Sequence, residues 1–308
     1  MKLTDLLGGS NLNRPLGVAF GLLSDRFTRE PPNEFHPVAW FGSAMGEIEQ
    51  AVWADRRGAG VAYTAIGVAI GAVAGQRVKS LSTVVSIAVA GGELRRTARH
   101  VTLALESGDV ATARDRLPAL VGRDPSELDA SEISAAVIES VAENSVDAVF
   151  APAFWGLVAG APGAAAYRAI NTMDAMVGHH SERYEHFGWA AARLDDIANW
   201  IPARIFAVCV AVQQPERFSV ILRLVRRDAP AHPSPNAGVA ETAMAGAIGR
   251  QLGGPLRYGD RVEHRPRLGD GDRPQPADVD RAVRIADRAE WIATGALGLV
   301  GLLRLRRR

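Results

Sequence analysis

The sequence predicts a mainly α-helical protein that is embedded in a membrane. Two observations lead to this prediction: several long runs lack charged residues, and arginines flank those runs. No segment alternates apolar and polar residues as a half-buried strand would. The mean hydropathy of +0.01 over 308 residues therefore averages apolar helices with strongly charged segments. We expect one membrane-embedded helical domain that spans residues 1–308.

The composition excludes three other classes of protein. The 35 Lys and Arg residues nearly cancel the 34 Asp and Glu residues, and a net charge of +1 does not favour a nucleic-acid partner. A hydrophobic content of 47% is too high for a disordered chain. The single cysteine, Cys209, excludes a disulfide framework and a cysteine-based zinc site.

Five apolar segments are the candidate membrane-associated elements: residues 59–76, 80–92, 148–167, 205–213 and 291–303. The first has about the minimum length of a membrane-spanning helix, and the third contains two prolines that a span tolerates when its neighbours satisfy the freed backbone. The second and fourth are too short to be identified as spans. A soluble, alanine-rich helical protein is the alternative. An arginine cluster follows the last segment and favours a cytoplasmic C-terminus.

Charged segments connect these runs. Residues 94–119 have a helical pattern that we expect to break at Gly108, with Asp109 capping the second half. Asp129 or Ser131 is the expected cap of the next helix. Residues 253–277 are rich in Gly, Pro, Arg and Asp and predict a polar surface loop. Residues 278–290 return to a charged helix that leads into the last apolar run.

Four polar clusters lie at the ends of the apolar runs, and the first contains Glu143, Asn144 and Asp147. Glu143 and Asp147 are four residues apart and share one face of a regular helix, where a cation between them would offset their repulsion. Carboxylate and amide oxygens are the ligands that Mg²⁺ prefers. This pattern indicates a Mg²⁺ site at a membrane boundary, and a helix end near solvent is the alternative.

The second cluster lies in the stretch NTMDAMVGHHSERYEHFG. Asn171 and Asp174 are three residues apart and share a helical face. The adjacent His179 and His180 do not share a face, and no partner histidine follows four residues later. We therefore expect these two histidines to be exposed loop residues and not metal ligands.

The third cluster lies in the stretch ARLDDIANWIPARI. Asp195 and Asn199 are four residues apart, and Asp196 lies beside them on another face. Arg193 and Arg204 flank this acidic centre. The arrangement suits a Mg²⁺–phosphate complex, because carboxylates hold the metal while guanidinium groups bind phosphate oxygens. A surface helix with local ion pairs is the alternative.

The fourth cluster is the loop HPSPNAG, which contains His232, Ser234 and Asn236. Its prolines, asparagine and glycine predict a rigid loop that presents backbone N–H groups and a histidine to an anion, and an ordinary turn is the alternative. The chain has no Walker A, GxSxG or HExxH motif. Lysine occurs only at Lys2 and Lys79, so arginine and Mg²⁺ would have to hold any nucleoside triphosphate.

In order along the chain, six stretches resemble the adenosylcobinamide-phosphate synthase family of cobalamin biosynthesis, CobD/CbiB. They are HPVAWFG (36–42), GRD (122–124), ESVAENSVDAVFAP (139–152), AINTMDAMVG (169–178), ERYEHFGWAAARLDDIANWIPARI (182–205) and RDAPAHPSPNAGVAETAMAGAIG (227–249). The resemblance covers nearly the whole chain. One departure is SVDA at 145–148, where the family more often has TSDG.

The resemblance implies a multi-pass protein of the cytoplasmic membrane whose active site faces the cytoplasm. It implies a ligase that joins adenosylcobyric acid to aminopropanol phosphate, or to free aminopropanol, through a new amide, with ATP as co-substrate and Mg²⁺ as cofactor. Membrane lipid, other cobalamin-assembly enzymes and a second copy of the chain are the expected partners, and nucleic acid is not. Rival functions are a membrane phosphotransferase acting on a lipid-linked alcohol, and a corrinoid transporter or non-catalytic scaffold.

The chemistry of an amide ligase matches the residue types in these clusters. A carboxylate becomes reactive toward an amine once it is phosphorylated, and phosphoryl transfer depends mainly on positioning and charge neutralisation. We therefore expect a catalytic set of Asp147, Asp174, Asp195, Asp196 and His232, and a metal-binding set of Glu143, Asn144, Asp147, Asp195 and Asp196. The expected phosphate-binding residues are Arg183, Arg193 and Arg204, and the expected substrate-loop residues are Ser234 and Asn236 beside His232. Either His232 or a carboxylate would serve as base for the amine.

Overall fold

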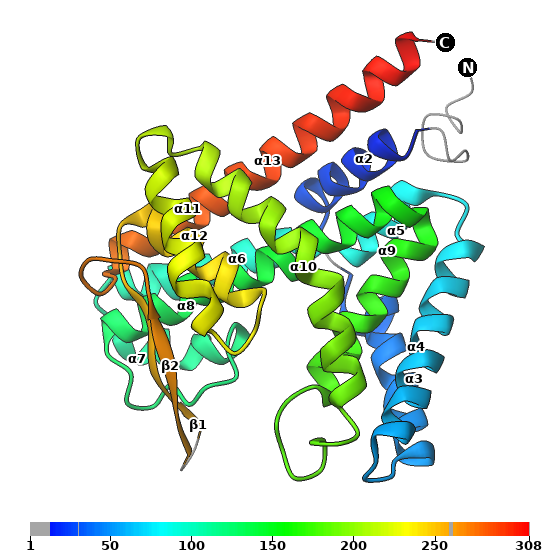
Figure 1. Cartoon of the computed structure of the whole chain (residues 1–308), viewed down its shortest axis with the longest axis horizontal. Helices are drawn as coiled ribbons and strands as arrows, with labels where there is room; N and C mark the ends of the chain where they lie inside the picture. Colours follow the sequence, from blue (N-terminus) through cyan, green and yellow to red (C-terminus); the bar gives the residue numbers. More distant parts are fainter. Residues whose placement is uncertain (1–12, 30, 259–260, 308) are drawn as a thin grey trace. The chain divides into compact units, whose positions relative to one another are not determined.

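The computed structural model describes residues 13–29, 31–258 and 261–307, which are mainly helical, as predicted (Figure 1). The chain divides into two compact units. Unit 1 comprises Met1–Gly91, Asp147–Asn199 and Thr294–Arg308, and unit 2 comprises Gly92–Val146 and Trp200–Ala293.

Unit 1 contains the helices at both ends of the described chain and the central helix α9. Its elements are α2 (Arg14–Phe27), the 3₁₀ turn η2 (Asn33–Phe35), α3 (Pro37–Val52), α4 (Arg57–Arg77), α5 (Leu81–Ala88), the π-helical turn η4 (Val146–Phe150), α9 (Ala151–Val177), the first half of α10 (Trp189–Val212) and the end of α13 (Pro276–Arg306). The predicted apolar segment 80–92 therefore contains only the short helix α5 and the start of α6. The predicted segment 205–213 belongs to a much longer helix.

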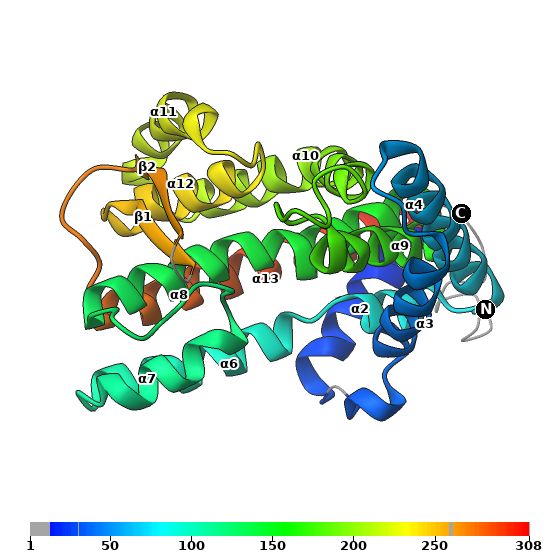
Figure 2. The same cartoon turned by 90° about the horizontal axis from the view of Figure 1, so that it is seen from below.

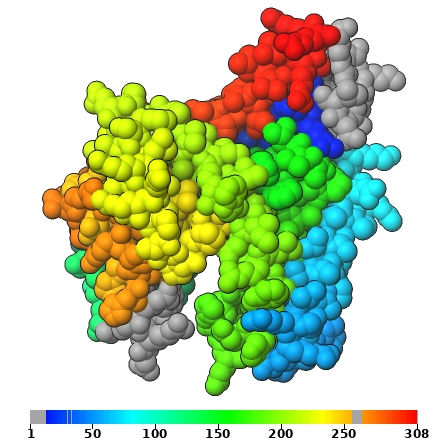
Figure 3. Space-filling view, in the orientation of Figure 1, coloured from blue at the N-terminus to red at the C-terminus, as the bar shows by residue number. Residues whose placement is uncertain are grey.

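Helices α4 and α9 pack closely because α4 carries small residues along one face. Figure 3 shows the blue N-terminal part of unit 1 lying against green segments of the same unit. A Cβ atom added at Gly71 would lie 2.9 Å from the carbonyl oxygen of Ala165, and one added at Gly75 would lie 2.5 Å from that of Ala161. Backbones approach this closely only where side chains are absent, which is the usual packing of membrane helices.

Prolines inside the long helices free backbone carbonyl groups, and distant donors bind them. Proline has no N–H, so the carbonyl four residues before it has no helical partner. Pro152 frees the carbonyl of Ala148, which accepts a hydrogen bond from the backbone N–H of Ala90 at 2.9 Å. Pro162 frees the carbonyl of Val158, and the guanidinium group of Arg14 donates to it.

The third such proline, Pro202, frees the carbonyl of Ala198 in α10. The indole Nε1 of Trp155 in α9 donates to this oxygen at 3.0 Å. These bonds anchor α9 to three other segments of unit 1. Helix α9 is also kinked at Gly160, whose φ of 72° is rare for any residue with a side chain.

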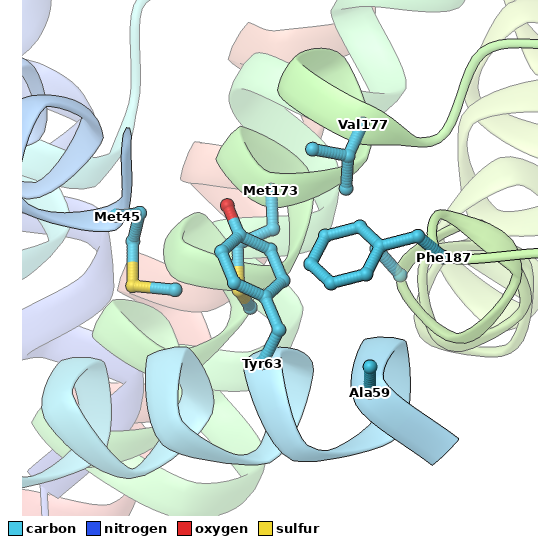
Figure 4. Packing of buried hydrophobic residues seen from close by; sticks show 7 residues of the cluster. Met45, Ala59, Tyr63, Met173, Val177 and Phe187 are labelled. Carbon is cyan, nitrogen blue, oxygen red and sulfur yellow. The ribbon is translucent and has the colours of Figure 1, made fainter. Parts of the chain in front are cut away.

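The apolar core of unit 1 surrounds the ring of Tyr63 (Figure 4). Tyr63 is fully buried, and its ring centroid lies 5.1 Å from that of Phe187. Met45 from α3 and Met173 from α9 complete this cluster, so the core joins α3, α4, α9 and the segment before α10.

Unit 2 combines helices with one antiparallel hairpin. Its elements are α6 (Gly91–Glu106), α7 (Val110–Arg116), the 3₁₀ turn η3 (Leu117–Ala119), α8 (Ala130–Ser145), the second half of α10, η5 (Pro215–Arg217), α11 (Phe218–Asp228), η6 (Ala229–Ala231), α12 (Ala237–Ile248), β1 (Leu252–Tyr258), β2 (Arg261–Leu268) and the first part of α13. Figure 2 shows α8, α12 and the hairpin together, and the three elements are in contact.

The hairpin corrects the prediction of a polar loop over residues 253–277. Strands β1 and β2 pair with Leu252 opposite Leu268, and the register is irregular between Gly253 and Pro255. Gly253 and Gly254 both have positive φ. The glycines and proline that indicated a loop therefore form an irregular stretch within a hairpin.

Several predicted helix ends are confirmed. Asp109 caps α7 by accepting a hydrogen bond from the N–H of Thr112, after a break at Gly108 with φ of 75°. Asp129 caps α8 in a capping box with Glu132. The charged segment 278–290 continues into the last apolar run as the single helix α13.

Two described helices are long and apolar enough to cross a membrane. They are Arg57–Arg77 and the continuous helix Ala130–Val177, and the bent pair Trp189–Val212 with Pro215–Ala231 would be a third. These candidate spans indicate a membrane protein and include the predicted runs 59–76 and 148–167. Helix α13, which holds residues 291–303, is not among the candidate spans of the described chain.

Candidate functional site

Asp195 is the centre of a polar cluster between α9 and α10 in unit 1. Its Oδ2 accepts a hydrogen bond from Nδ2 of Asn199 at 2.9 Å, and its Oδ1 accepts one from Nδ2 of Asn171 at 3.4 Å. The hydroxyl of Tyr167 in turn donates to Oδ1 of Asn199 at 2.8 Å. Because Asn199 is only 1% exposed, this chain of bonds fixes the Asp195 carboxylate from the buried side.

Two further predicted carboxylates interact electrostatically with this group. Asp174 interacts with Asp195, and Asp147 interacts with the Tyr167 hydroxyl that supports it. We call these residues together the Asp195 cluster: Asp147, Tyr167, Asn171, Asp174, Asp195 and Asn199. The structure therefore brings three of the predicted catalytic aspartates into one part of unit 1.

The Asp195 cluster would supply Mg²⁺ with some of its ligands, and water and phosphate oxygens would supply the rest. Among the described residues, no three His, Cys, Asp or Glu side chains are arranged so that they alone would hold a metal ion. Magnesium, however, commonly uses one or two carboxylates and takes its remaining ligands from water and substrate phosphates. Asp195 with Asp174 or Asp147 would supply such a partial set of hard oxygen ligands.

Asp196 and Arg193 lie beside the cluster and pair with each other. Their closest atoms are 3.4 Å apart, and the Arg193 side chain is 65% exposed. An ion pair with such an exposed arginine contributes little to stability. This geometry leaves the predicted roles of Asp196 and Arg193 untested.

Arg183 lies in the segment between α9 and α10, and its side chain has partners at the end of α3. Its Nη2 lies 2.9 Å from Oε1 of Glu49, and its guanidinium group stacks over the ring of Trp53 at 4.7 Å. Binding a phosphate at Arg183 would have to compete with Glu49. The neighbouring His180 is exposed in this segment and contacts Glu185, as the loop prediction required.

The first predicted cluster lies where the regular helix α8 ends. Helix α8 ends at Ser145 and continues as the π-helical turn Val146–Phe150, so Glu143 and Asp147 are not related by regular α-helical spacing. They also belong to different compact units. The assumption of an uninterrupted α-helix at this point is therefore corrected: Glu143 lies in the last turn of α8, and Asp147 lies in the π-helical turn that follows.

A second polar cluster lies in unit 2 around α8 and α12. Glu139 is buried, pairs with Arg123 at 2.5 Å, and accepts a hydrogen bond from the N–H of Gly253 at 2.8 Å. Glu143 interacts electrostatically with Glu139 and Arg123. The bonds of Glu139 connect α8 to the segment before it and to the hairpin.

His232 and Glu241 form the buried part of this second cluster. Their side chains are 2% and 4% exposed, and Nε2 of His232 lies 3.7 Å from Oε2 of Glu241. Nη1 of Arg265 lies 3.3 Å from the same nitrogen. Burial raises the pKa of Glu241 well above its ordinary value, and the nearby carboxylates of Glu139 and Glu143 raise it further. We call Arg123, Glu139, Glu143, His232, Glu241 and Arg265 the His232 cluster.

The predicted substrate loop is held rigidly, as its composition indicates. Oγ of Ser234 accepts hydrogen bonds from the N–H groups of Asn236 and Ala237, which begin α12. Oδ1 of Asn236 accepts a hydrogen bond from Nη1 of Arg204 at 3.2 Å. The structure thus brings together Arg204 and Asn236, two residues predicted from separate stretches of sequence. Asn144 lies on α8, where its side chain donates to the carbonyl of Ser140.

Comparison with known proteins places the chain in a family. A family model described as "CobD/Cbib protein" matches residues 18–286. The chain belongs to the CobD/CbiB family. Three similar proteins are each named "Cobalamin biosynthesis protein CobD". The protein of Mycobacterium tuberculosis strain H37Rv is 44% identical over 96% of this chain and 97% of its own length.

Two CobD/CbiB relatives from other bacteria show similar agreement. The protein of Rhodobacter capsulatus is 41% identical over 87% of this chain and 90% of its own length. That of Chromobacterium violaceum is also 41% identical, over 91% of this chain and 95% of its own length. No solved structure matches the chain. These findings confirm the family resemblance and a place in cobalamin biosynthesis.

Sequence reasoning missed several residues that this CobD/CbiB chain places in the two clusters. Tyr167 was not predicted because nothing in the sequence links it to Asn199, which is 32 positions away. A signal did exist for Glu241, which is the only charged residue in the apolar helix AGVAETAMAGAI. An acid in such a helix is costly to bury without a partner, so its presence indicates a function or a buried pair.

Proposed function

We propose that this chain is an ATP- and Mg²⁺-dependent ligase that joins adenosylcobyric acid to aminopropanol phosphate, or to aminopropanol, through an amide bond. Its membership of a family named for cobalamin biosynthesis supports the pathway. The observation that carries the reaction is the Asp195 carboxylate, which two amide side chains orient while other carboxylates lie nearby.

The first proposed step makes the acid reactive. A carboxylate oxygen of the corrinoid forms a bond to the terminal phosphorus of ATP, the bond from that phosphorus to ADP breaks, and an acyl phosphate results. When bound, Mg²⁺ supplies charge neutralisation for the phosphate oxygens. Asp195, held by Asn171 and Asn199, would keep its remaining lone pairs directed at this ion. Arg193 would contribute positive charge to the phosphates.

The second proposed step forms the amide. The amine nitrogen attacks the acyl carbon, the bond from carbon to the phosphate oxygen breaks, and inorganic phosphate leaves. The nitrogen then loses a proton to a base. His232 is 2% exposed at its side chain and pairs with Glu241, so we assign it to holding the loop in place. A carboxylate of the Asp195 cluster is the proposed base.

The decisive experiment measures ADP release and amide product together. The purified chain is given Mg²⁺, ATP, adenosylcobyric acid and aminopropanol phosphate, and each substrate is omitted in turn. We expect ADP to appear only when the corrinoid is present, and amide to appear only when the amine is present too. Asp195→Asn should abolish both products. Asp55→Asn, which changes an exposed aspartate of the same unit, should leave both unchanged.

The rival functions predict other results in the same assay. ATP-independent binding of the corrinoid, with no amide, would support a scaffold or transporter. Phosphoryl transfer to a lipid alcohol without corrinoid would support a phosphotransferase. Wild-type amide formation by Asp195→Asn would overturn the proposed metal site while leaving the ligase reaction standing.

A further inference from the structure

Unit 1 contains an apolar cavity that the proposed reaction does not use. Its volume is about 370 Å³, which is within the range of small-molecule sites. Helices α3, α4, α5 and α9 line it, and Ile70, Ala74, Val84 and Ile87 are typical of its surface. Corrinoids and nucleotides carry many polar groups, so an interior of this kind suits neither of the proposed substrates.

One charged residue, Arg168 of α9, is present among the described residues that line this cavity. A second source of positive potential lies beside it. Pro37 and Val38, the first residues of the 16-residue helix α3, also line the cavity, and a helix N-terminus favours a negative charge. His36 caps this end by accepting the N–H of Val38 at 3.2 Å.

The positive charge of Arg168 acts on His36 at the N-terminus of α3. Burial and the nearby Arg168 guanidinium group both lower the pKa of His36. The cavity therefore combines long apolar walls with a concentrated positive charge. Charge complementarity requires an occupant that is apolar along most of its length and negative at one end.

We propose that this cavity binds a membrane phospholipid with an anionic headgroup, whose acyl chain lies along α4 and α5 and whose phosphate contacts Arg168. The candidate membrane-spanning helix Arg57–Arg77 forms one wall, so lipid is the amphiphile available to the cavity. This inference does not depend on the ligase reaction.

The lipid site is connected to the Asp195 cluster through one side chain. Nη1 of Arg168 lies 3.4 Å from Oδ1 of Asn171, and Asn171 donates to Asp195. A phosphate bound at Arg168 would compete with Asn171 for the guanidinium group. Lipid binding is therefore placed to change how firmly Asn171 orients Asp195.

The test uses the full chain in neutral detergent micelles. Two lipids, phosphatidylglycerol and phosphatidylcholine, carry the same nitroxide-labelled acyl chain and differ only in headgroup charge. The fluorescence of Trp40, which lines the cavity, reports binding by quenching, and Trp40→Phe gives the background from the other tryptophans. We expect phosphatidylglycerol to quench Trp40 at about fivefold lower concentration, the usual effect of one basic residue on an anionic lipid.

Three variants locate the site. Arg168→Gln should remove the preference for phosphatidylglycerol, while Arg57→Gln, which removes one charge elsewhere in unit 1, should keep it. Ala74→Phe should weaken quenching by both lipids, because the larger side chain fills the cavity. Equal quenching by the two lipids in the wild type, or an unchanged preference in Arg168→Gln, would overturn the proposal even if Ala74→Phe does not fold. These quenching results do not depend on ATP turnover, so they test the lipid site and not the ligase reaction.

Discussion

Two buried tyrosines of unit 1 differ in whether their hydroxyl groups have hydrogen-bond partners. The Tyr167 hydroxyl donates to Oδ1 of Asn199 at 2.8 Å. The Tyr63 hydroxyl is buried and has no hydrogen-bond partner among the described residues. We predict that Tyr167→Phe destabilises the protein, whereas Tyr63→Phe is neutral or stabilising.

The magnitudes follow from the cost of an unpaired buried polar group. Tyr167→Phe leaves Oδ1 of Asn199 buried without its donor, which costs about 1 to 3 kcal/mol. For a chain of this size, about 2 °C per kcal/mol gives a Tm lowered by about 2 to 6 °C. Tyr63→Phe removes an oxygen that lies among apolar side chains (Figure 4), so the loss of an unsatisfied group offsets any change in packing.

The assay is thermal unfolding of both variants in the same detergent, followed by circular dichroism. Activity gives a second readout, because releasing Asn199 also loosens Asp195, which Asn199 holds at 2.9 Å. We expect Tyr167→Phe to need more Mg²⁺ for half-maximal ADP release and Tyr63→Phe to need the wild-type amount. Equal loss of stability in the two variants would refute the reasoning, since both lose the same atom from a buried ring.

Two other predictions concern packing and pH. Gly60→Ala should lower the free energy of unfolding by at least about 1 to 3 kcal/mol in thermal or denaturant unfolding, because the new Cβ would overlap the carbonyl oxygen of Phe187. Gly46→Ala, at a helical position with no atom within 4 Å of the new Cβ, should be neutral or slightly stabilising, and the reverse order would contradict the packing argument. The raised pKa of Glu241 means that its contribution to stability is present at low pH and is lost as the pH rises through that raised value. Wild-type Tm should therefore fall with rising pH relative to Glu241→Gln, and parallel Tm profiles for the two proteins would show that Glu241 is not the group responsible.

Local features of the fold were predictable from the sequence because they depend on neighbours in the chain. Asp129 caps α8 through residues within three positions of itself, and the break at Gly108 needs only a glycine with positive φ. The pairing of β1 and β2 was missed because their glycines and prolines are also typical of a loop. What distinguishes a hairpin from a loop is the pairing of strands, and pairing is a tertiary property.

In the candidate site too, the features that depend on local sequence were predictable, and those that depend on packing were not. Residue types and helical spacing were enough to predict Asp195 and to connect the chain with Mg²⁺ and phosphate chemistry. The partnership of Tyr167 with Asn199 depends on how α9 packs against α10, and no spacing within either helix contains it. The π-helical turn at Val146–Phe150 was likewise not predictable, because the spacing of Glu143 and Asp147 was interpreted on a regular α-helix.

The sequence by itself determined the class of the protein: helical, membrane-associated and a member of the CobD/CbiB family. Those conclusions rest on composition, period and ordered motifs, which are properties of the linear chain. Only the tertiary structure decided which polar groups are paired. Pro152, Pro162 and Pro202 are visible in the sequence as interruptions, yet the donors that bind their freed carbonyls come from 43 to 144 positions away. Partners so distant are chosen by packing, because an unpaired buried carbonyl accepts the nearest available N–H in space whatever its position in the chain.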